Sequence, residues 1–256
     1  MSLEVTVLGC DGGYPGPGGA GSGYLVRSNG VALCLDAGPG VLARVQQEIA
    51  LEALDAVVVS HEHPDHASDL DGLAVALHFA AEPRRVPVYA PRGVRALRYF
   101  ADWPELDWQE VADGDTVGLR GLVLRFSQTD HGPETLAVRV DGGGTSLGYS
   151  ADTGPEWSFE ALGGPLDLAL CEATWTRQQE GRAQHLSGRQ AGRMARGAGA
   201  TELVVTHRWP TLPVEPVTAE ASEAFGAPVR SAHPGARYTV VTSEDSLFPA
   251  PGASPG

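Results

Sequence analysis

The chain has 256 residues, of which 42% are hydrophobic and 20% are charged, a composition typical of a globular protein that buries a core. Its formal net charge is −14. Proteins that hold a long polyanion ordinarily carry a basic surface, because neutralising phosphates supplies much of their affinity. A long RNA or DNA is therefore not the expected partner, and a phosphate-bearing substrate should be small.

The cysteines and the first residues bear on the cellular compartment. Cys10, Cys34 and Cys171 lie in apolar, strand-like runs without paired spacing, as expected of buried, reduced thiols. Residues 1–9 lack the basic and apolar regions of a signal peptide, and no stretch has the length of a membrane span. We expect a cytoplasmic protein that makes no membrane contact.

The first part of the chain alternates short β-rich runs with turns. We expect strands over residues 3–8, 23–27, 31–35, 55–60 and 87–90, and helices over residues 41–49, 73–81 and 93–100. A loop dense in Gly and Pro fills residues 11–22, and a polar loop covers residues 61–71. The nearly continuous apolar run at 55–60 is typical of a strand that is covered on both faces.

The second part repeats this alternation. We expect strands over residues 119–128, 135–140, 145–150, 166–171, 202–206 and 237–241, and helices over residues 187–197 and 217–225. Two β-rich halves with helices predict an α/β protein with a four-layer αββα sandwich. No linker separates the halves, so residues 1–247 are predicted to form a single domain, and residues 248–256 a disordered Pro, Gly and Ser tail.

The most informative segment is Ser-His-Glu-His-Pro-Asp-His at residues 60–66. It places four ligand-type side chains within six residues, directly after an apolar strand: His61, His63, Asp65 and His66. Imidazole and carboxylate groups together suit Zn, Mn or Fe. A single histidine would be weak evidence, but this spacing favours a metal site.

Three further candidate ligands each follow an expected strand. His131, Asp152 and His207 come after the runs at 119–128, 145–150 and 202–206. Taken alone, each is an ordinary loop residue. Their shared position at the carboxyl ends of strands indicates that they belong to the same site as the motif at 60–66.

This pattern, together with the Asp36-Ala37-Gly38 turn, resembles the metallo-β-lactamase superfamily over nearly the whole chain. The resemblance implies two divalent metal ions, with zinc expected and Mn or Fe left open. It implies one ion on His61, His63 and His131, the other on Asp65, His66 and His207, and Asp152 between them. Asp36 would orient a ligand through a hydrogen bond.

Two later stretches resemble the ribonuclease Z branch of that superfamily: Leu-Cys-Glu-Ala-Thr-Trp at residues 170–175 and Gln-His-Leu-Ser-Gly at residues 184–188. The resemblance implies that His185 faces the scissile phosphate and that Glu172 supports it. An expelled alkoxide needs a proton or a positive group beside it, which fits this role. Asp65 is the candidate general base for a water activated by the two metals. The alternative is that His185, at the start of a helix, only caps that helix or faces solvent.

The segment between Asp152 and His185 lacks the long basic arm of the members that process transfer RNA. The runs at residues 5–10, 22–26, 171–176 and 185–188 are similar to the atypical cyclic-nucleotide phosphodiesterases of actinobacteria. This likeness predicts a phosphodiesterase for a small substrate, with a cyclic nucleotide favoured. Relatives in the branch are commonly dimers, so a homodimer is an open expectation.

Several alternatives remain open from the sequence. The same metal pair could serve an ester, lactone or phosphotriester hydrolase, or an endoribonuclease that trims transfer RNA 3′ ends. A degenerate binding module is a non-enzyme alternative, although such domains usually lose ligands and this chain keeps all seven. The Gly-rich loop lacks the ending of a P-loop, so its role is open. Aromatic residues that could line a substrate pocket are His78, Phe79, Trp175 and Trp209.

Overall fold

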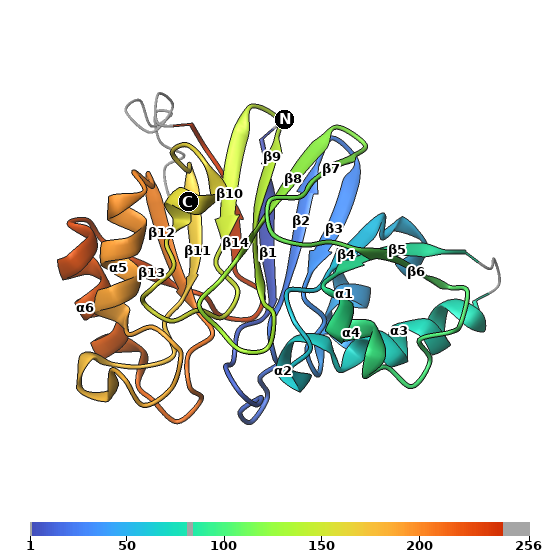
Figure 1. The fold of residues 1–256 in the computed structure, drawn as a ribbon, viewed down its shortest axis with the longest axis horizontal. Helices are drawn as coiled ribbons and strands as arrows, with labels where there is room; N and C mark the ends of the chain where they lie inside the picture. Colours follow the sequence, from blue (N-terminus) through green and yellow to red (C-terminus); the bar gives the residue numbers. More distant parts are fainter. Residues whose placement is uncertain (1, 81–83, 243–256) are drawn as a thin grey trace, which may run out of the picture.

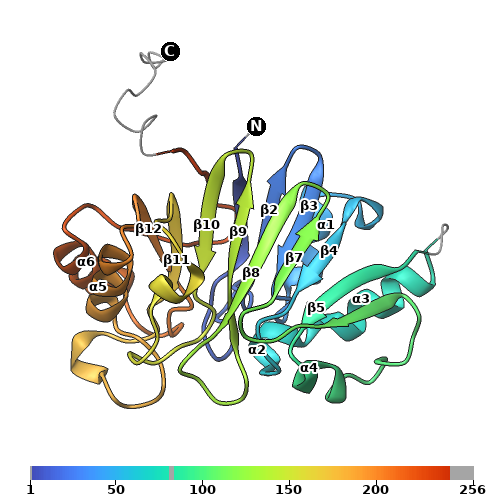
Figure 2. The same ribbon diagram turned by 45° about the horizontal axis from the view of Figure 1, so that its top comes forward.

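Two seven-stranded sheets form the centre of the structure, and helices cover their outer faces (Figure 1). The computed structural model describes residues 2–80 and 84–242 of the chain. Turning the molecule shows helices α5 and α6 on one flank and helices α1, α3 and α4 on the other, with the strands between them (Figure 2). The predicted four-layer αββα sandwich is confirmed.

The first sheet is built mostly from the first half of the chain. Its strands lie in the order β14 (Arg237–Thr239), β1 (Glu4–Gly9), β2 (Gly23–Ser28), β3 (Val31–Leu35), β4 (Ala56–Val58), β5 (Val86–Ala90) and β6 (Leu106–Glu110). The pairings from β14 to β3 are antiparallel, and those from β3 to β6 are parallel.

The second sheet repeats this arrangement. Its strands lie in the order β13 (Arg230–Ser231), β12 (Glu202–Thr206), β11 (Leu168–Glu172), β10 (Thr145–Tyr149), β9 (Leu136–Gly142), β8 (Leu122–Gln128) and β7 (Thr116–Leu119). Strands β13 to β10 pair in parallel, and strands β10 to β7 pair antiparallel. Both sheets therefore change from parallel to antiparallel pairing at an internal strand, as pseudo-duplicated halves would.

Alternating side chains of the strands build three apolar layers. In β3, Leu33 and Leu35 pack into the core between the sheets, whereas Cys34 packs toward the helices. Successive side chains of a strand point to opposite faces, so a strand covered on both sides must be apolar throughout. This explains why such runs showed no polar alternation.

The covering helices pack closely at small residues. Helices α1 (Val41–Glu48) and α3 (Asp69–His78) cover the first sheet, and helices α5 (Gly188–Gly197) and α6 (Val214–Phe225) cover the second. Ser187 caps α5 by accepting a hydrogen bond from Gln190 N, the geometry of a capping box. A Cβ atom on Gly188 would lie 2.1 Å from Val217 O, so only glycine lets the two helices approach this closely.

Some predicted boundaries were wrong. The expected strand over 119–128 corresponds to β8 (Leu122–Gln128) but begins too early, because Arg120 and Gly121, at φ 46° and 95°, form the turn that joins β8 to β7 (Thr116–Leu119). The expected loop over 61–71 contains helix α2 (Pro64–Ala67) and the start of α3, since proline suits the first turn of a helix. Helix α4 (Arg92–Ala96) is shorter than expected.

Two other predictions need separate comment. The expected tail over 248–256, the domain boundary at 247 and the end of the expected helix at 81 lie outside the described residues. Within residues 2–80 and 84–242, no helix combines the length and the apolar character needed to cross a bilayer.

Candidate metal centre

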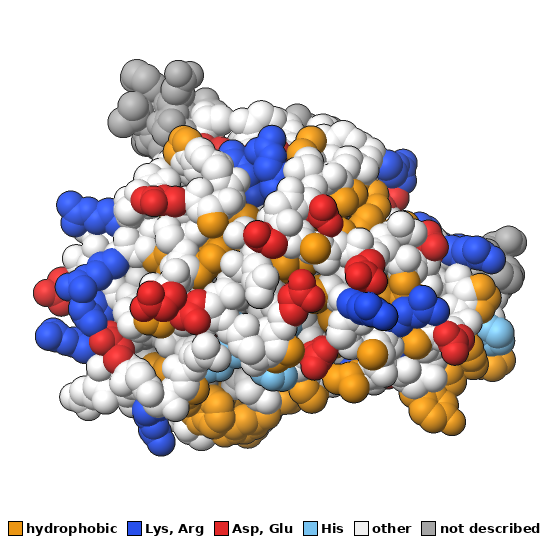
Figure 3. Space-filling view, in the orientation of Figure 1, with side chains coloured by type: hydrophobic (Ala, Val, Ile, Leu, Met, Phe, Trp, Pro, Cys, Tyr) orange, Lys and Arg blue, Asp and Glu red, His pale blue; other side chains and the backbone are white. Residues whose placement is uncertain are grey.

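The predicted ligands gather where strands of both sheets end. His61 follows β4, His131 follows β8, Asp152 follows β10 and His207 follows β12. These ends meet at the lower edge of the molecule in Figure 1, next to helix α2, and histidine side chains reach the surface at the same edge in Figure 3. Segments far apart in sequence thus contribute to one site.

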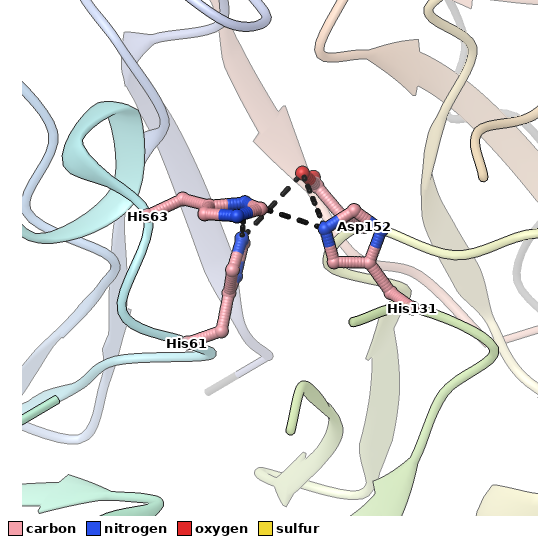
Figure 4. Close-up of side chains that lie close together, drawn as sticks. All are labelled: His61, His63, His131 and Asp152. Atoms are coloured by element: carbon pink, nitrogen blue, oxygen red, sulfur yellow. Dashed lines mark hydrogen bonds and ion pairs between the residues drawn. The ribbon is translucent and has the colours of Figure 1, made fainter. Parts of the chain in front are cut away.

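A first cluster joins His61, His63, His131 and Asp152 (Figure 4). His63 Nδ1 lies 2.9 Å from His61 Nε2 and 3.3 Å from His131 Nε2. Nitrogen ligands about 2.0 Å from one zinc ion are roughly 3.3 Å apart in a tetrahedral site. The spacing of these three rings therefore suits a shared cation.

A second cluster joins Asp65, His66 and His207. His207 Nε2 lies 3.1 Å from both His66 Nε2 and Asp65 Oδ2, and His66 Nε2 lies 3.5 Å from Asp65 Oδ2. All three side chains are buried. This is again a compact set of nitrogen and oxygen donors around one point.

Asp152 stands between the two clusters, with one oxygen toward each. Its Oδ2 lies 3.6 Å from His61 Nε2 and its Oδ1 lies 3.2 Å from His66 Nε2. Oδ1 is buried, yet it accepts no hydrogen bond of good geometry from any described residue. An orphaned carboxylate oxygen of this kind is costly unless a ligand satisfies it, and a metal ion would.

The buried carboxylates of the site also favour bound cations. Burial alone would raise the pKa of Asp152, but the rings of His207, His66 and His61 lower it well below its usual range. Burial alone would lower the pKa of His66, but Asp152, Asp36 and Asp65 raise it well above its usual value. Buried carboxylates are retained in proteins when they are paired or coordinate metals. The donor set therefore fits two divalent ions.

Contacts behind the clusters fix the orientation of the rings. His131 Nδ1 lies 3.1 Å from Gln184 O, and His207 Nδ1 lies 2.9 Å from Thr174 Oγ1. A proton held on Nδ1 leaves the Nε2 lone pair facing the cluster, which is how second partners prepare histidine ligands.

Asp36 orients the ring of His66 from the turn after β3. Its Oδ2 lies 2.7 Å from His66 Nδ1 and accepts hydrogen bonds from Tyr149 (2.6 Å) and Ser60 (3.0 Å). Ser60 N donates to the other oxygen at 2.7 Å. Asp36 thus holds the candidate ligand His66 from behind, and neither of the two clusters includes Asp36.

Glu172 and His185 form a third element of the site. Glu172, at the end of β11, is fully buried, and its Oε1 lies 2.9 Å from His185 Nδ1 and accepts from Thr153 N at 2.8 Å. Its Oε2 accepts from Thr174 Oγ1 at 2.9 Å and from Leu186 N at 3.1 Å. Burial lowers the pKa of His185, but the Glu172 carboxylate outweighs it, so the pKa rises to about 9.

His185 is positioned beside both clusters. Its ring stacks on that of His207 at 5.4 Å and lies 5.2 Å from that of His131. His185 lies two residues before Ser187, the N-cap of α5, but its side chain contacts Glu172, and Ser187 is the residue that caps the helix. Because Nδ1 faces Glu172, the other ring nitrogen is left for a ligand.

Comparison with known proteins identifies the family. Residues 32–208 match the family model described as the Beta-lactamase superfamily domain. The chain belongs to the metallo-β-lactamase superfamily.

The relatives place the chain in the branch of this superfamily that includes YhfI and ribonuclease Z. It is 35% identical over 246 residues to an uncharacterized protein of Mycobacterium tuberculosis, with 90% of each chain covered. It is 31% identical over 218 residues to Probable metallo-hydrolase YhfI of Bacillus subtilis, covering 80% of this chain and 86% of YhfI. The crystal structure of YhfI matches with a TM-score of 0.86 and 29% identity over 93% of this chain and 99% of that chain. Ribonuclease Z of Mycobacterium bovis is 28% identical over 244 residues, covering 82% of this chain and 87% of that protein.

The Gly-rich loop, whose role the sequence left open, borders the site of this superfamily member. Gly13 N donates a 2.7 Å hydrogen bond to Asp65 Oδ2, and a Cβ on Gly12 would lie 2.5 Å from His207 O. Gly38 approaches the motif similarly, since its Cβ would lie 2.0 Å from Asp65 O. These glycines let three loops pack backbone to backbone around the second cluster.

The aromatic candidates divide into two groups. Trp175 and Trp209 pack together near His185, with ring centroids 5.2 Å apart. His78 instead contacts Glu105 and Trp103, and Phe79 packs edge-on against His78 with 76% of its side chain exposed. Among the residues that the structure describes, no hydrogen bond, ion pair or ring contact links this second group to the clusters. The sequence also gave no signal for three supporting residues. The hydroxyl groups of Ser60 and Tyr149 contact Asp36, and the hydroxyl group of Thr174 contacts Glu172 and His207.

Proposed function

We propose that this protein is a metal-dependent hydrolase that cleaves small phosphodiesters, with a cyclic nucleotide as the leading substrate. The position of His185 carries the proposal. Its ring lies beside both metal clusters, and Glu172 supports it at 2.9 Å. Cleavage of a phosphodiester expels an alkoxide, and a protonated imidazole beside the scissile bond can supply the proton or stabilise the charge.

The metal ligands are assigned from the two clusters. His61, His63 and His131 would hold one ion, Asp65, His66 and His207 the other, and Asp152 would contribute one oxygen to each. Zinc fits these nitrogen and oxygen donors, as do manganese and iron. When bound, the pair of ions would lower the pKa of a water molecule and polarise the phosphate oxygens.

Asp65 is proposed both as a ligand and as the general base. Gly13 N and His207 Nε2 contact the same carboxylate oxygen, Oδ2. Burial would raise the pKa of Asp65, but His66 and His207 lower it below its usual range. The group is therefore ionised, as both a metal ligand and a carboxylate that accepts a proton from water must be.

The names of the relatives and the net charge of the chain support a small phosphodiester as the substrate class. The names of the relatives include a metallo-hydrolase and a ribonuclease, and ribonucleases cut phosphodiester bonds. The net charge of −14 disfavours a long polyanion, which argues for a small phosphodiester. The likeness to a ribonuclease Z keeps transfer RNA 3′ processing as the second candidate.

Turnover of two substrates tests the proposal. Zinc-loaded protein would be given bis(p-nitrophenyl) phosphate and cyclic AMP, with p-nitrophenyl acetate and a lactone as carbon-ester comparisons. We expect cleavage of both phosphodiesters, loss of activity in His66→Ala, and no loss in His233→Ala, which removes an exposed histidine that belongs to neither cluster. Cleavage of the carbon esters alone would leave the metal site standing and overturn the substrate class.

A further inference from the structure

We propose that Tyr14 and Trp209 form the surface on which the aromatic base of the substrate stacks, with Trp175 supporting Trp209 from behind. The inference rests on the proposed function, because it places the organic group of the same phosphodiester. It assigns a substrate role to the Gly-rich loop, which the mechanism otherwise uses only for its contact with Asp65.

A continuous row of rings leads away from the metal clusters. The ring of His185 lies 6.5 Å from that of Trp175, Trp175 lies 5.2 Å from Trp209, and Trp209 lies 5.3 Å from Tyr14. His185 is partly buried beside the clusters, whereas Tyr14 is 42% exposed. The row therefore runs from the reacting end of the site to solvent, the direction in which the rest of a bound substrate must extend.

Each ring is carried by a segment that also holds the metal site. Tyr14 follows Gly13, whose N–H donates to Asp65. Trp209 lies two residues after His207, and Trp175 follows Thr174, which contacts His207 Nδ1. Short lengths of backbone thus hold the row at a fixed place beside the metal clusters.

The row is rigid, as a recognition surface should be. Gly13 has a φ of +78°, and a Cβ there would lie 2.8 Å from Trp209 Cζ3, so the indole packs directly on the loop backbone. Arg208 donates to the carbonyl of Trp209 at 3.0 Å, and Gly12 N donates to the carbonyl of Arg208 at 3.0 Å. The loop and the segment after β12 therefore fix each other.

The surface suits a flat aromatic group. Tyr14 meets Trp209 edge-on at 84°, so the two rings present differently oriented faces. The guanidinium of Arg182 lies over the ring of Trp175 at 5.6 Å, which covers that ring from another side. Hydrophobic side chains gather beside the histidines at the lower edge in Figure 3. Bases of every kind stack on aromatic side chains, so the row would bind nucleotides with little preference among bases.

A matched pair of ligands isolates the contribution of the base. Adenosine 5′-monophosphate and ribose 5-phosphate carry the same phosphate and differ in the base, and calorimetry on the zinc-loaded full chain measures both without turnover. We expect Tyr14→Ala and Trp209→Ala to weaken binding of the nucleotide about tenfold and to leave ribose 5-phosphate unchanged. Tyr14→Phe, which keeps the ring, should match wild type. Tyr99→Ala, which removes an 87% exposed ring from another part of the surface, should also match it.

The outcomes separate this inference from the proposed function. Equal binding of the two ligands by the wild type, or an equal loss of both in Tyr14→Ala, would overturn the stacking surface even if cyclic AMP is hydrolysed. Base-dependent binding that Tyr14→Ala abolishes would support the surface even if no phosphodiester is cleaved. In that case the reaction assigned to the site is wrong and the base recognition is right.

Discussion

Tyr149 in the second sheet donates a 2.6 Å hydrogen bond to Asp36 Oδ2, in the turn that follows β3 of the first sheet. The same oxygen lies 2.7 Å from His66 Nδ1, so the contact between the sheets also sets the ring of a predicted metal ligand. Both side chains are buried. The fold and the metal centre therefore depend on one hydrogen-bonded group.

Replacing Tyr149 with Phe removes a partner from a buried carboxylate. We expect the free energy of unfolding to fall by about 1–3 kcal/mol. Metal affinity should fall by about 10–100-fold, because Asp36 would hold His66 less firmly. Denaturant unfolding and competition with a chelator measure the two effects. Tyr99→Phe, at an exposed position, is the control, and unchanged metal affinity in Tyr149→Phe would show that Asp36 does not position the ligand.

Replacing His185 with Gln separates catalysis from metal binding. Loss of an acid or base group costs about 10²- to 10⁴-fold in turnover, and we expect that loss in kcat with little change in KM. Metal content should remain at the wild-type value, because the proposed ligand set does not include His185. Its ring nitrogen lies near Asp152 and His207, so a fall in metal content measured by atomic emission would instead make it a ligand.

Replacing Gly38 with Ala tests the close packing of the loops. The added Cβ would lie 2.0 Å from the carbonyl oxygen of Asp65 and 2.9 Å from the backbone of Gly21. Backbone must move to relieve both contacts, so we expect loss of the second metal equivalent and a lower melting temperature. Gly30→Ala is a matched control for stability alone, since nothing lies within 4 Å of its Cβ although its φ of +79° adds strain. Equal metal content in both variants would contradict the prediction.

The thiols should be inert in the folded protein. Burial raises the pKa of Cys10 and of Cys34 to about 12, against about 8.5 for an exposed thiol. We expect no fast reaction with Ellman's reagent at pH 8 and three reactive thiols after unfolding. A raised pKa in the folded state also means that stability is complete below about pH 8.5 and falls as the pH rises toward 12. A rapidly reacting thiol in native protein would show that these strands open readily.

The sequence predicted which candidate metal ligands would lie together, because their signal is local. His61, His63, Asp65 and His66 follow one strand within six residues, and the other candidates each follow a strand end. The carboxyl ends of neighbouring parallel strands meet at one edge, so position in the chain was enough to bring these residues together.

The supporting contacts could not be predicted in this way. Tyr149 lies 113 residues from Asp36 and Thr174 lies 33 residues from His207, and each has the sequence environment of an ordinary strand or loop residue. Strand β6 was missed because Asp107 and Gln109 break its apolar pattern, as is common at a sheet edge. The Gly-rich loop could be recognised as a loop, but its contact with Asp65 depends on the fold of the whole chain.

The most direct test of the central claim follows cyclic AMP by phosphorus NMR. Protein stripped of metal would be titrated with zinc, and the phosphodiester signal would be followed after each addition. We predict that formation of the phosphomonoester reaches its full rate at two equivalents per chain, stops on chelation and is absent in Asp152→Asn. A protein that binds two equivalents and leaves cyclic AMP intact would contradict it.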